Sequence, residues 1–400
     1  MEGPPSWPRQ QLREVLSERR EYGRPELPLL SVSSHEGVRL RAGERDEGLR
    51  ATGDLDTYLV VHAGDLVVNK LVARSGAFGI STHDGIVSPA YYCFSPDAGQ
   101  VDPRYLDYAL HSGPGIGEIW RRSKDLPPNA FDISRENFER IRIPLPPLDT
   151  QRRIVGMLDA ETDRIDKLIA KNERVLSLVQ LRLAAIRETL LAAYPEAPLR
   201  YYVQSLTQGS SPEVGNVTAR EEEPGILRLS ALRPGKYRPE ESKSVEDSDA
   251  YHLIGAVLAQ EGLVLVSRAN TPERVGDACL VDRTLPGPRY VPDLMFALTT
   301  AASLAPAYLV HALLTSRVRG QVQSAARGSS PSMVKLRQGD VMSLRIPLPP
   351  RSEQEVLVGE LKRVDEKTDG LREKVNRQQG LLRLRRQALI TAAVTGQIEV

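Results

Sequence analysis

Histidine and cysteine are the side chains that most often hold a metal ion, and their spacing in this chain does not favour a metal site. The two cysteines, Cys93 and Cys279, lie far apart and form no CxxC pair. The six histidines show neither HxxxH nor HExxH spacing: His35, His62, His83, His111, His252 and His311. We therefore expect no zinc site, no disulfide scaffold and a reducing compartment, with the histidines on the surface or in turns.

Other patterns that could support catalysis are incomplete. Gly235-Lys236 lacks the upstream glycine of a phosphate-binding loop, because Ser230 stands there. The Pro-Pro pairs at 146–147 and 349–350 follow leucine, whereas the base-holding loop of amino-methyltransferases has a polar residue at that place. The Glu-x-Lys patterns at 241–243 and 360–362 have no suitably placed Pro-Asp to complete a nuclease triad. The chain is therefore predicted to bind rather than to catalyse.

The sequence contains two copies of one unit. Arg142–Pro147 recurs as Arg345–Pro350, and the same offset places Gln151 on Gln354. Further matches join Leu158 to Leu361, Asp166 to Asp369, Tyr105–Leu110 to Tyr308–Leu313 and, with small insertions, Gly64–Lys70 to Gly262–Arg268. Internal repeats of this kind indicate repeated structural modules.

Each copy begins with short β-rich runs between Gly and Pro residues and ends in a long segment with heptad spacing. The first seam is Ile154, Leu158, Glu161, Ile165, Leu168, Asn172, Val175, Val179, Arg182 and Ile186. The second is Leu357, Leu361, Val364, Thr368, Leu371, Val375, Gln378, Leu382, Arg385 and Leu389. A helix of about 40 residues rises roughly 60 Å, so each is predicted to be a spacer. We expect the two helices to pack on each other; the alternative is pairing with another chain.

The predicted fold class is α+β, with two repeated α/β domains separated by two long helices that pack as an antiparallel coiled coil with pseudo-twofold symmetry. The expected divisions are 1–148 for the first domain, 149–194 for the central helix, 195–350 for the second domain and 351–400 for the C-terminal helix. Lys and Arg number 53 against 52 Asp and Glu, so the chain lacks the overall positive field of a DNA-coating protein. The sequence shows no signal segment and no apolar run long enough to cross a bilayer, so we expect a cytoplasmic protein without a membrane partner.

Several segments also carry a family resemblance. They are Gly64–Lys70, Gly76–Ser81 and Asp84–Tyr92 in the first domain, Pro146–Ile154 at the helix entry and Arg386–Gln397 near the end of the chain. Together they resemble the specificity (S) subunits of Type I restriction–modification enzymes, over essentially the entire chain. The second domain departs from the pattern at Arg268–Thr271 and Val275–Ala278, which is typical of a different recognition-domain subtype.

The resemblance implies a non-catalytic DNA-recognition subunit with two target-recognition domains. Each domain would read, through the major groove, one half of a bipartite asymmetric target in double-stranded DNA. Methyltransferase (M) subunits would dock on the helices and carry S-adenosylmethionine, and motor-nuclease (R) subunits would use ATP and Mg. This chain would bind no cofactor itself.

A DNA reader needs fork-shaped or amide side chains for base edges and cations or hydroxyls for phosphates. On that ground the predicted DNA-binding residues are Lys70, Arg74, Ser75, Ser81, His83, Tyr91, Arg121, Arg122 and Lys124 in the first domain, and Arg268, Asn270, Arg274, Arg327, Ser329, Ser330 and Lys335 in the second. Two alternatives stay open. One is the recognition subunit of a methylation-only or differently organised restriction system; the other is a coiled-coil scaffold whose globular repeats bind protein.

Overall fold

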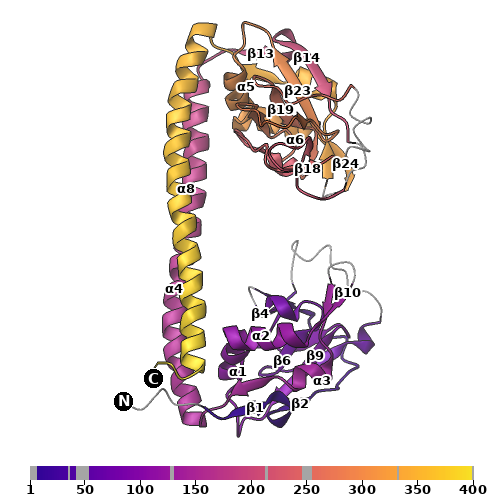
Figure 1. The fold of residues 1–400 in the computed structure, drawn as a ribbon, viewed down its shortest axis with the longest axis vertical. Coiled ribbons are helices and arrows are strands. Elements are labelled where there is room, and N and C mark those ends of the chain that lie inside the picture. Colours follow the sequence, from indigo (N-terminus) through magenta and orange to yellow (C-terminus); the bar gives the residue numbers. More distant parts are fainter. Residues whose placement is uncertain are drawn as a thin grey trace. The chain divides into compact units, whose positions relative to one another are not determined.

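The computed structural model describes residues 7–34, 37–41, 54–126, 130–211, 215–245, 255–330 and 333–398. The chain divides into two compact units (Figure 1). Unit 1 is Met1–Glu173 with Asn376–Val400, and unit 2 is Arg174–Val375. Two long helices, α4 (Leu148–Leu191) and α8 (Arg351–Val394), each contribute one half to each unit.

Unit 1 is built on an antiparallel sheet in the order β2 (Leu16–Glu18), β9 (Tyr91–Pro96), β6 (Leu66–Asn69) and β7 (Phe78–Ile80). Successive side chains of a strand point to opposite faces. Leu66 and Val68 therefore enter the main core, while Val67 enters a second core with Cys93. Helices α1 (Pro103–His111) and α2 (Gly113–Arg122) supply the other side of the main core.

The remaining elements of unit 1 are short. They are β1 (Arg9–Gln11) paired with β12 (Arg142–Pro144), β3 (Leu30–Ser33) with β4 (Gly37–Leu40), β5 (Leu59–Val61) with β8 (Gly85–Val87), β10 (Lys124–Leu126) with β11 (Ala130–Asp132), helix α3 (Arg135–Glu139) and 3-10 turns at Leu12–Glu14, Leu55–Thr57 and Ala73–Ser75. Helix α1 begins where Asp102 accepts hydrogen bonds from the backbone of Arg104 and Tyr105, with proline in the first turn.

Unit 2 repeats this plan with an antiparallel sheet in the order β14 (Val203–Gln208), β23 (Met295–Thr300), β19 (Val264–Ser267) and β21 (Ala278–Leu280). Helices α5 (Pro306–Leu313) and α6 (Ser316–Ala325) pack on it. The remaining elements are β13 (Glu196–Pro198) with β26 (Arg345–Pro347), β18 (Ser242–Ser244) with β15 (Gly225–Leu227) and β22 (Arg289–Tyr290), β16 (Leu232–Arg233) with β17 (Lys236–Tyr237), β20 (Ala269–Asn270) with β25 (Met333–Lys335) and β24 (Arg327–Ser330), helix α7 (Gln338–Ser343) and 3-10 turns at Leu199–Tyr201 and Leu229–Ala231.

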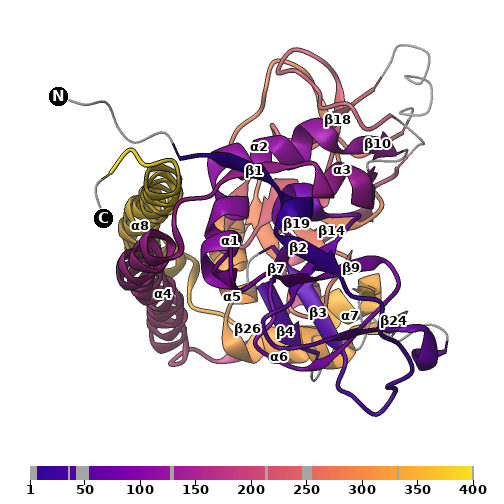
Figure 2. The same ribbon diagram turned by 90° about the horizontal axis from the view of Figure 1, so that it is seen from below.

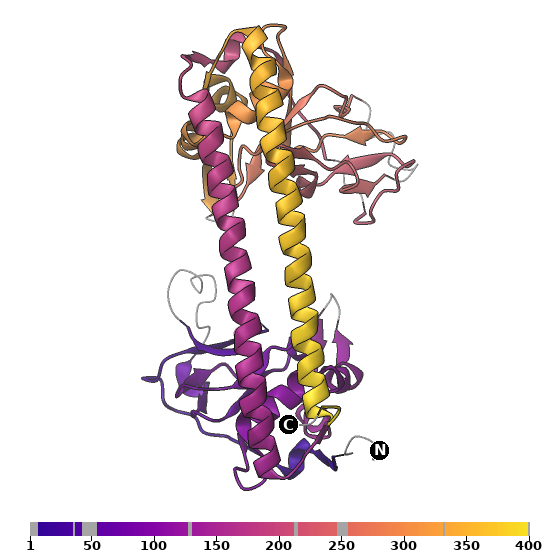
Figure 3. The same cartoon turned by 90° about the vertical axis from the view of Figure 1, so that its left-hand side faces the viewer.

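The long helices pack antiparallel within each unit, as Figure 3 shows for both pairs of helix halves. In unit 1, Ile154 and Leu158 of α4 share a core with Ile390 and Val394 of α8. In unit 2, Leu191 of α4 shares a core with Leu357 of α8. These contacts confirm the predicted fold class and the pairing of the two helices within one chain.

The buried faces of these helices differ in part from the predicted heptads. Correctly predicted buried positions are Ile154, Leu158, Ile165, Leu357, Leu361, Thr368 and Val375. The prediction is wrong for Leu168, Arg182, Leu371, Gln378 and Arg385, which are exposed, and the other positions are half-buried. Thr162, Arg187 and Gln379 are buried instead. A helix with 3.6 residues per turn drifts away from a strict heptad, and α1 and α5 cover part of each helix besides the partner helix.

The histidines do not all lie on the surface. His311 on α5 is 8% exposed, and His111 on α1 is half-buried, where its ring packs against that of Phe78 with centroids 4.2 Å apart and a tilt of 31°. Both follow from the amphipathic packing of their helices, which metal-ligand spacing does not predict. His35 and His252 lie outside the described residues. Cys93 and Cys279 are free and buried, and no helix within the described ranges is long and apolar enough to cross a membrane.

Candidate nucleic-acid interface and helix surface

A three-stranded sheet in unit 2 gathers most of the predicted DNA-binding residues of the second domain. In this sheet β25 lies between β20 and β24, and Lys335 stands opposite both Ala269 and Arg327. The backbone N–H of Leu336 also donates to the carbonyl of Arg268 at 2.8 Å, which fixes the residue before β20 beside β25. The sheet therefore collects Arg268, Asn270, Arg327, Ser329, Ser330 and Lys335.

The side chains of this cluster differ in exposure and in their hydrogen-bond contacts. Arg327 and Lys335 are exposed. Asn270 is half-buried and its Nδ2 lies 3.4 Å from the hydroxyl of Ser267, while Arg268 donates to the carbonyl of Asp293 at 3.3 Å. Only the backbone of Ser329 and Ser330 is described, as part of β24.

Arg274 lies apart from that cluster. Its Nε lies 3.3 Å from a carboxylate oxygen of Asp277, and another of its nitrogens donates to the carbonyl of Leu232 at 3.4 Å. Asp277 is buried, and burial raises its pKa although Arg319 and Arg274 oppose that shift. These contacts give Arg274 a structural function as the partner of a buried carboxylate.

Unit 1 places Lys70 and Lys124 in the equivalent surroundings. The repeat offset superimposes Lys124 on Arg327, and both begin the hairpin that follows the second short helix. The N–H of Ile133, next to β11, donates to the carbonyl of Lys70 at 3.3 Å. The Nζ of Lys70 lies 6.0 Å from the ring centre of Tyr92, and Lys124 is exposed.

Tyr91 is half-buried at the same end of β6, where it pairs with Asn69 in the strand register. Burial raises the pKa of its hydroxyl, and a hydrogen bond with Asn69 acts against that shift. Tyr91 is therefore held within the sheet next to Lys70 and stays protonated at neutral pH.

Arg74 is half-buried, and its guanidinium packs against two aromatic rings. Its guanidinium carbon lies 4.6 Å from the ring centre of Trp120 and 4.2 Å from that of Phe131, and the group donates to the carbonyl of Ser123 at 2.9 Å. The indole N–H of Trp120 returns a hydrogen bond of 3.2 Å to the carbonyl of Arg74. Arg74 thus ties the turn after β6 to α2 and β11, and its prediction as a DNA contact stays a prediction.

The two arginines at the end of α2 share one carboxylate. Arg121 and Arg122 both pair with Glu118 on α2, Arg122 at 3.0 Å. Glu118 is 7% exposed, and burial acts to raise its pKa, but the hydrogen bonds from Arg122 and Arg121 bring it below its usual value. The exposed Ser75 lies in the 3-10 turn after β6, where its hydroxyl donates to the carbonyl of Val72 at 2.9 Å.

Ser81 and His83 lie at the opposite end of the sheet from Lys70. Leu66 begins β6 opposite Ile80, and the N–H of Gly64 donates to the carbonyl of Ser81 at 2.8 Å. Ser81 is 2% exposed, and its hydroxyl donates to the carbonyl of His83 at 2.7 Å. His83 is exposed. The structure therefore does not bring these two residues to the hairpin that carries Lys124.

Each unit thus has a two-stranded hairpin, β10–β11 in unit 1 and β24–β25 in unit 2, beside the segment that follows β6 or β19. The exposed cations of these hairpins are Lys124 in unit 1 and Arg327 and Lys335 in unit 2. A two-stranded ribbon can enter the major groove of DNA, where lysine and arginine contact phosphates or guanine edges and asparagine can read adenine. The hairpin tips, 127–129 and 331–332, lie outside the described residues.

Each unit carries a second candidate site on one long helix, formed by a pair of exposed leucines outside the predicted seam. Leu178 and Leu181 of α4 are 55% and 66% exposed, and Leu381 and Leu384 of α8 are 59% and 68% exposed. The repeat offset places Leu178 on Leu381 and Leu181 on Leu384. The recurrence of these leucines between the seam positions is visible in the sequence. Only their burial in the structure shows which of the repeated leucines face solvent.

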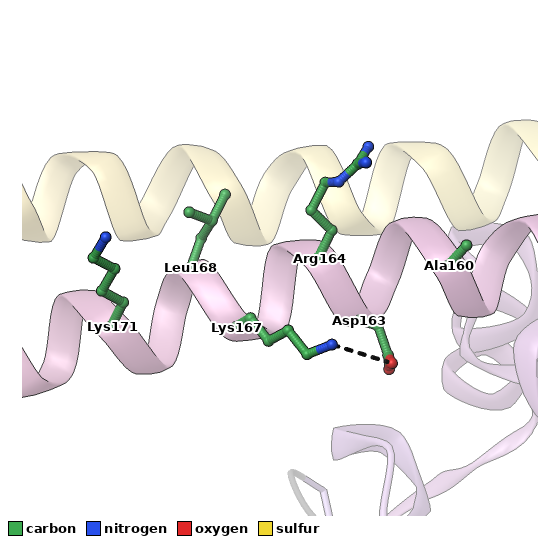
Figure 4. A pocket seen from close by; sticks show the side chains of 6 residues that line it. All are labelled: Ala160, Asp163, Arg164, Lys167, Leu168 and Lys171. Carbon is green, nitrogen blue, oxygen red and sulfur yellow. Dashed lines mark ion pairs between the residues drawn. The ribbon is translucent and has the colours of Figure 1, made fainter.

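A shallow pocket lies along α4 in unit 1. It is lined by Ala160, Asp163, Arg164, Lys167, Leu168 and Lys171 (Figure 4). Lys167 pairs with Asp163 at 3.9 Å, and Arg164 pairs with Glu161 at 3.0 Å, so these cations are engaged along their own helix. One open helix face without convergent polar groups does not resemble a small-molecule or catalytic site.

No protein-family model and no curated protein sequence matches this chain. Among solved structures, a chain from work on complex assembly and conformational transition of the type I R-M system has a TM-score of 0.66 and 18% identity, with 100% of both chains covered. The HsdS subunit from Thermoanaerobacter tengcongensis has a TM-score of 0.44 and 17% identity, over 100% of this chain and 99% of that chain. The S subunit of a Type-I restriction-modification system from M. genitalium has a TM-score of 0.36 and 13% identity, over 97% and 96%. The first match shows that this chain has, over its full length, the fold of a chain of a type I restriction–modification system, and it confirms the resemblance at the level of the fold.

Proposed function

We propose that this chain is the DNA sequence-recognition subunit of a type I restriction–modification complex. The observation that carries the proposal is the full-length fold likeness to a chain of such a system, with a TM-score of 0.66. The duplicated α/β domain supports a bipartite target, with one domain for each half-site. Catalysis would belong to partner subunits.

In this proposal the hairpin clusters are the DNA-reading surfaces. Arg327, Lys335 and Lys124 are exposed cations that would contact phosphates, and Arg268 and Asn270 have the forked or amide geometry that reads base edges. The two clusters are not identical, because the offset superimposes Asp132 of unit 1 on Lys335 of unit 2. This difference supports an asymmetric target whose half-sites have different sequences.

The exposed leucines of α4 and α8 are proposed as the docking surface for methyltransferase subunits. Burial of a leucine side chain at an interface contributes about 1.5–3 kcal/mol, so a pair on each helix is a substantial anchor. The methyltransferase subunits would carry S-adenosylmethionine, and motor-nuclease subunits would supply ATP- and Mg-dependent translocation and cleavage. This chain would contribute the sequence specificity alone.

The decisive experiment compares the chain alone with the chain plus its methyltransferase subunit. We expect no methyltransferase, ATPase or nuclease activity from the chain alone, and sequence-specific methylation after the methyltransferase is added. Sequencing of methylated adenines in the source genome, with and without this gene, should give a bipartite motif that is lost with the gene. Turnover by the pure chain, or an unchanged methylation pattern after deletion, would contradict the proposal.

The same experiment addresses the open alternatives. A methylation-only system would give the motif but no restriction of unmodified DNA when all neighbouring subunits are present. A protein-binding scaffold would give neither a motif nor DNA affinity.

A further inference from the structure

A fully buried glutamine stands in the first turn of each long helix. Gln151 of α4 and Gln354 of α8 are both 0% exposed, and the repeat offset superimposes them. Buried side-chain amides are kept only where their hydrogen-bonding groups find partners, because each unsatisfied group costs about 1–3 kcal/mol. The partners of these amides therefore show what the glutamines hold together.

In unit 1, Gln151 joins the start of α4 to the start of α1. Its Oε1 accepts from the N–H of Asp102 at 2.8 Å, and its Nε2 donates to the carbonyls of Gln100 at 2.9 Å and Pro146 at 2.8 Å. Asp102 is also the residue that caps α1. One amide thus fixes the loop before α1, the Pro-Pro entry and the first turn of α4 relative to one another.

Unit 2 has the same arrangement with different neighbours. The Oε1 of Gln354 accepts from the N–H of Ala305 at 2.7 Å, and its Nε2 donates to the carbonyls of Ser303 and Pro349, both at 3.0 Å. Ala305 immediately precedes α5. Both glutamines bond only to backbone groups, so their contacts do not depend on the side chains of the loops. The same hydrogen-bond arrangement is therefore present in both units although the two loops differ in sequence.

We call the contact between α1 and α4 in unit 1, and that between α5 and α8 in unit 2, the joint. Beyond the glutamine, the side-chain contacts of the two joints differ. In unit 1, Tyr108 of α1 donates to Asp159 of α4 at 2.8 Å, and Arg104 also pairs with Asp159, at 2.7 Å. In unit 2 the residue equivalent to Tyr108 is His311, whose Nδ1 lies 4.0 Å from Asp365 of α8. The glutamine contact is therefore a shared feature of two joints whose other side-chain contacts have diverged.

Helix α1 lies between the sheet of unit 1 and α4, as the view along the long helices shows (Figure 2). A rotation of α1 on α4 would therefore turn the whole α/β domain, including the hairpin that carries Lys124. One base pair corresponds to about 3.4 Å along the duplex and to roughly 35° of rotation, given 10–10.5 base pairs per turn. A small change of angle at the joint would then change which gap between half-sites fits.

We infer that Gln151 and Gln354 are positioning residues that fix the angle of each recognition domain on the helices, and thereby the gap between half-sites that the complex accepts. This inference rests on the proposed function. Both glutamine side chains are fully buried, so they should affect the tolerated gap without affecting the base sequence read in either half-site.

The test uses the full chain assembled with its methyltransferase subunit. Synthetic duplexes would carry the two half-sites found by methylation sequencing, with the native gap and with gaps one base pair shorter and longer. Gln354→Met keeps the side-chain length and removes all three hydrogen bonds, whereas Gln354→Glu keeps the acceptor and loses both donors. We expect the preference of the wild-type complex for the native gap to fall by about tenfold or more in both variants, equivalent to ~1.4 kcal/mol.

A matched control separates positioning from general loss of stability. Leu265 on β19 is 0% exposed and lies in a separate core that includes no residue of α5 or α8, so Leu265→Ala creates a cavity away from the joint. This variant should lower the midpoint of thermal unfolding and keep the wild-type gap preference. Equal loss of gap preference in Leu265→Ala, or an unchanged preference in the Gln354 variants, would overturn the inference.

The same substitutions at Gln151 provide an independent copy of the test, in case one joint does not tolerate the change. If the wild-type complex methylates no bipartite target, the proposed function itself is wrong and the inference falls with it. If the wild-type complex reads a bipartite target and all Gln151 and Gln354 variants keep its gap, only the inference is wrong.

Discussion

In unit 2 the guanidinium of Arg187, on α4, lies 3.5 Å from the carboxylate of Asp365, on α8. Arg187 is 7% exposed, so the pair is largely removed from water. The repeat offset places Ile390 at the position of Arg187 and Thr162 at that of Asp365, and both are buried in unit 1. The contact between the two long helices therefore uses a charged pair in unit 2 and an uncharged pair in unit 1.

Removing one member of this pair should cost much more stability than replacing both. Asp365→Thr leaves the buried guanidinium of Arg187 without its carboxylate, and we expect a loss of about 3–5 kcal/mol. The double variant Arg187→Ile/Asp365→Thr reproduces the unit 1 residues and should unfold with nearly wild-type free energy. Denaturant unfolding of the full chain measures both, and additive losses in the double variant would argue against a coupled pair.

Unit 2 should lose stability in weak acid because of His311. Burial, with a smaller contribution from Arg187, lowers the pKa of His311 to about 4, below its ordinary value of 6.5. The unfolded chain therefore binds a proton that the folded chain does not, and stability falls as the pH drops from about 7 towards 4, by up to ~3 kcal/mol. The same joint also contains Asp365, whose pKa is raised by burial and which acts in the opposite direction.

His311→Tyr is the matched variant for that prediction, because tyrosine is the unit 1 residue at this position, Tyr108. The midpoint of thermal unfolding should fall less between pH 7 and pH 4.5 in the variant than in the wild type. Nearby charges of Arg187, Lys236, Asp369 and Arg372 remain in both proteins and cancel in the comparison. Parallel pH profiles would show that His311 is not the titrating group.

The exposed leucines should be needed for assembly and dispensable for folding. Leu178→Asp/Leu181→Asp on α4 should weaken binding of the methyltransferase subunit by about tenfold or more, because two apolar anchors are replaced by charges. Circular dichroism should be unchanged. Arg182→Ala, an exposed position on the same turn, is the control and should bind normally. If the leucine variant bound the methyltransferase subunit as tightly as the wild type, these leucines would not be the docking surface.

Substitutions in the unit 2 hairpin cluster should distinguish base reading from phosphate binding. Asn270→Ala is expected to relax one half-site by about 1–3 kcal/mol of discrimination and to leave the other half-site intact. Arg327→Ala should instead weaken binding to all sequences and reduce the salt dependence by about one phosphate contact. Methylation motifs and salt titrations of the assembled complex measure both effects. If Asn270→Ala changed both half-sites, separate reading by each unit would be refuted.

The sequence alone determined the duplication, the two long helices and the antiparallel pairing that the structure confirms. Repetition and heptad spacing are properties of the linear chain, so they can be read without knowing any neighbour. Gln151 and Gln354 were visible as matched positions, but their function was not, because their partners are backbone groups of a loop about fifty residues away in the chain.

Tertiary structure decided which residues of these elements are available to a partner. The heptad spacing predicts a buried Leu168 and does not include Arg187, yet Leu168 is exposed and Arg187 is buried. Arg74 packs against two aromatic rings contributed by distant segments, and its place in the sequence does not reveal these neighbours. Exposure depends on what covers a side chain, and here the covering groups come from the partner helix, from α1 and α5 and from the hairpins. Those contacts are fixed only when segments far apart in the chain pack together.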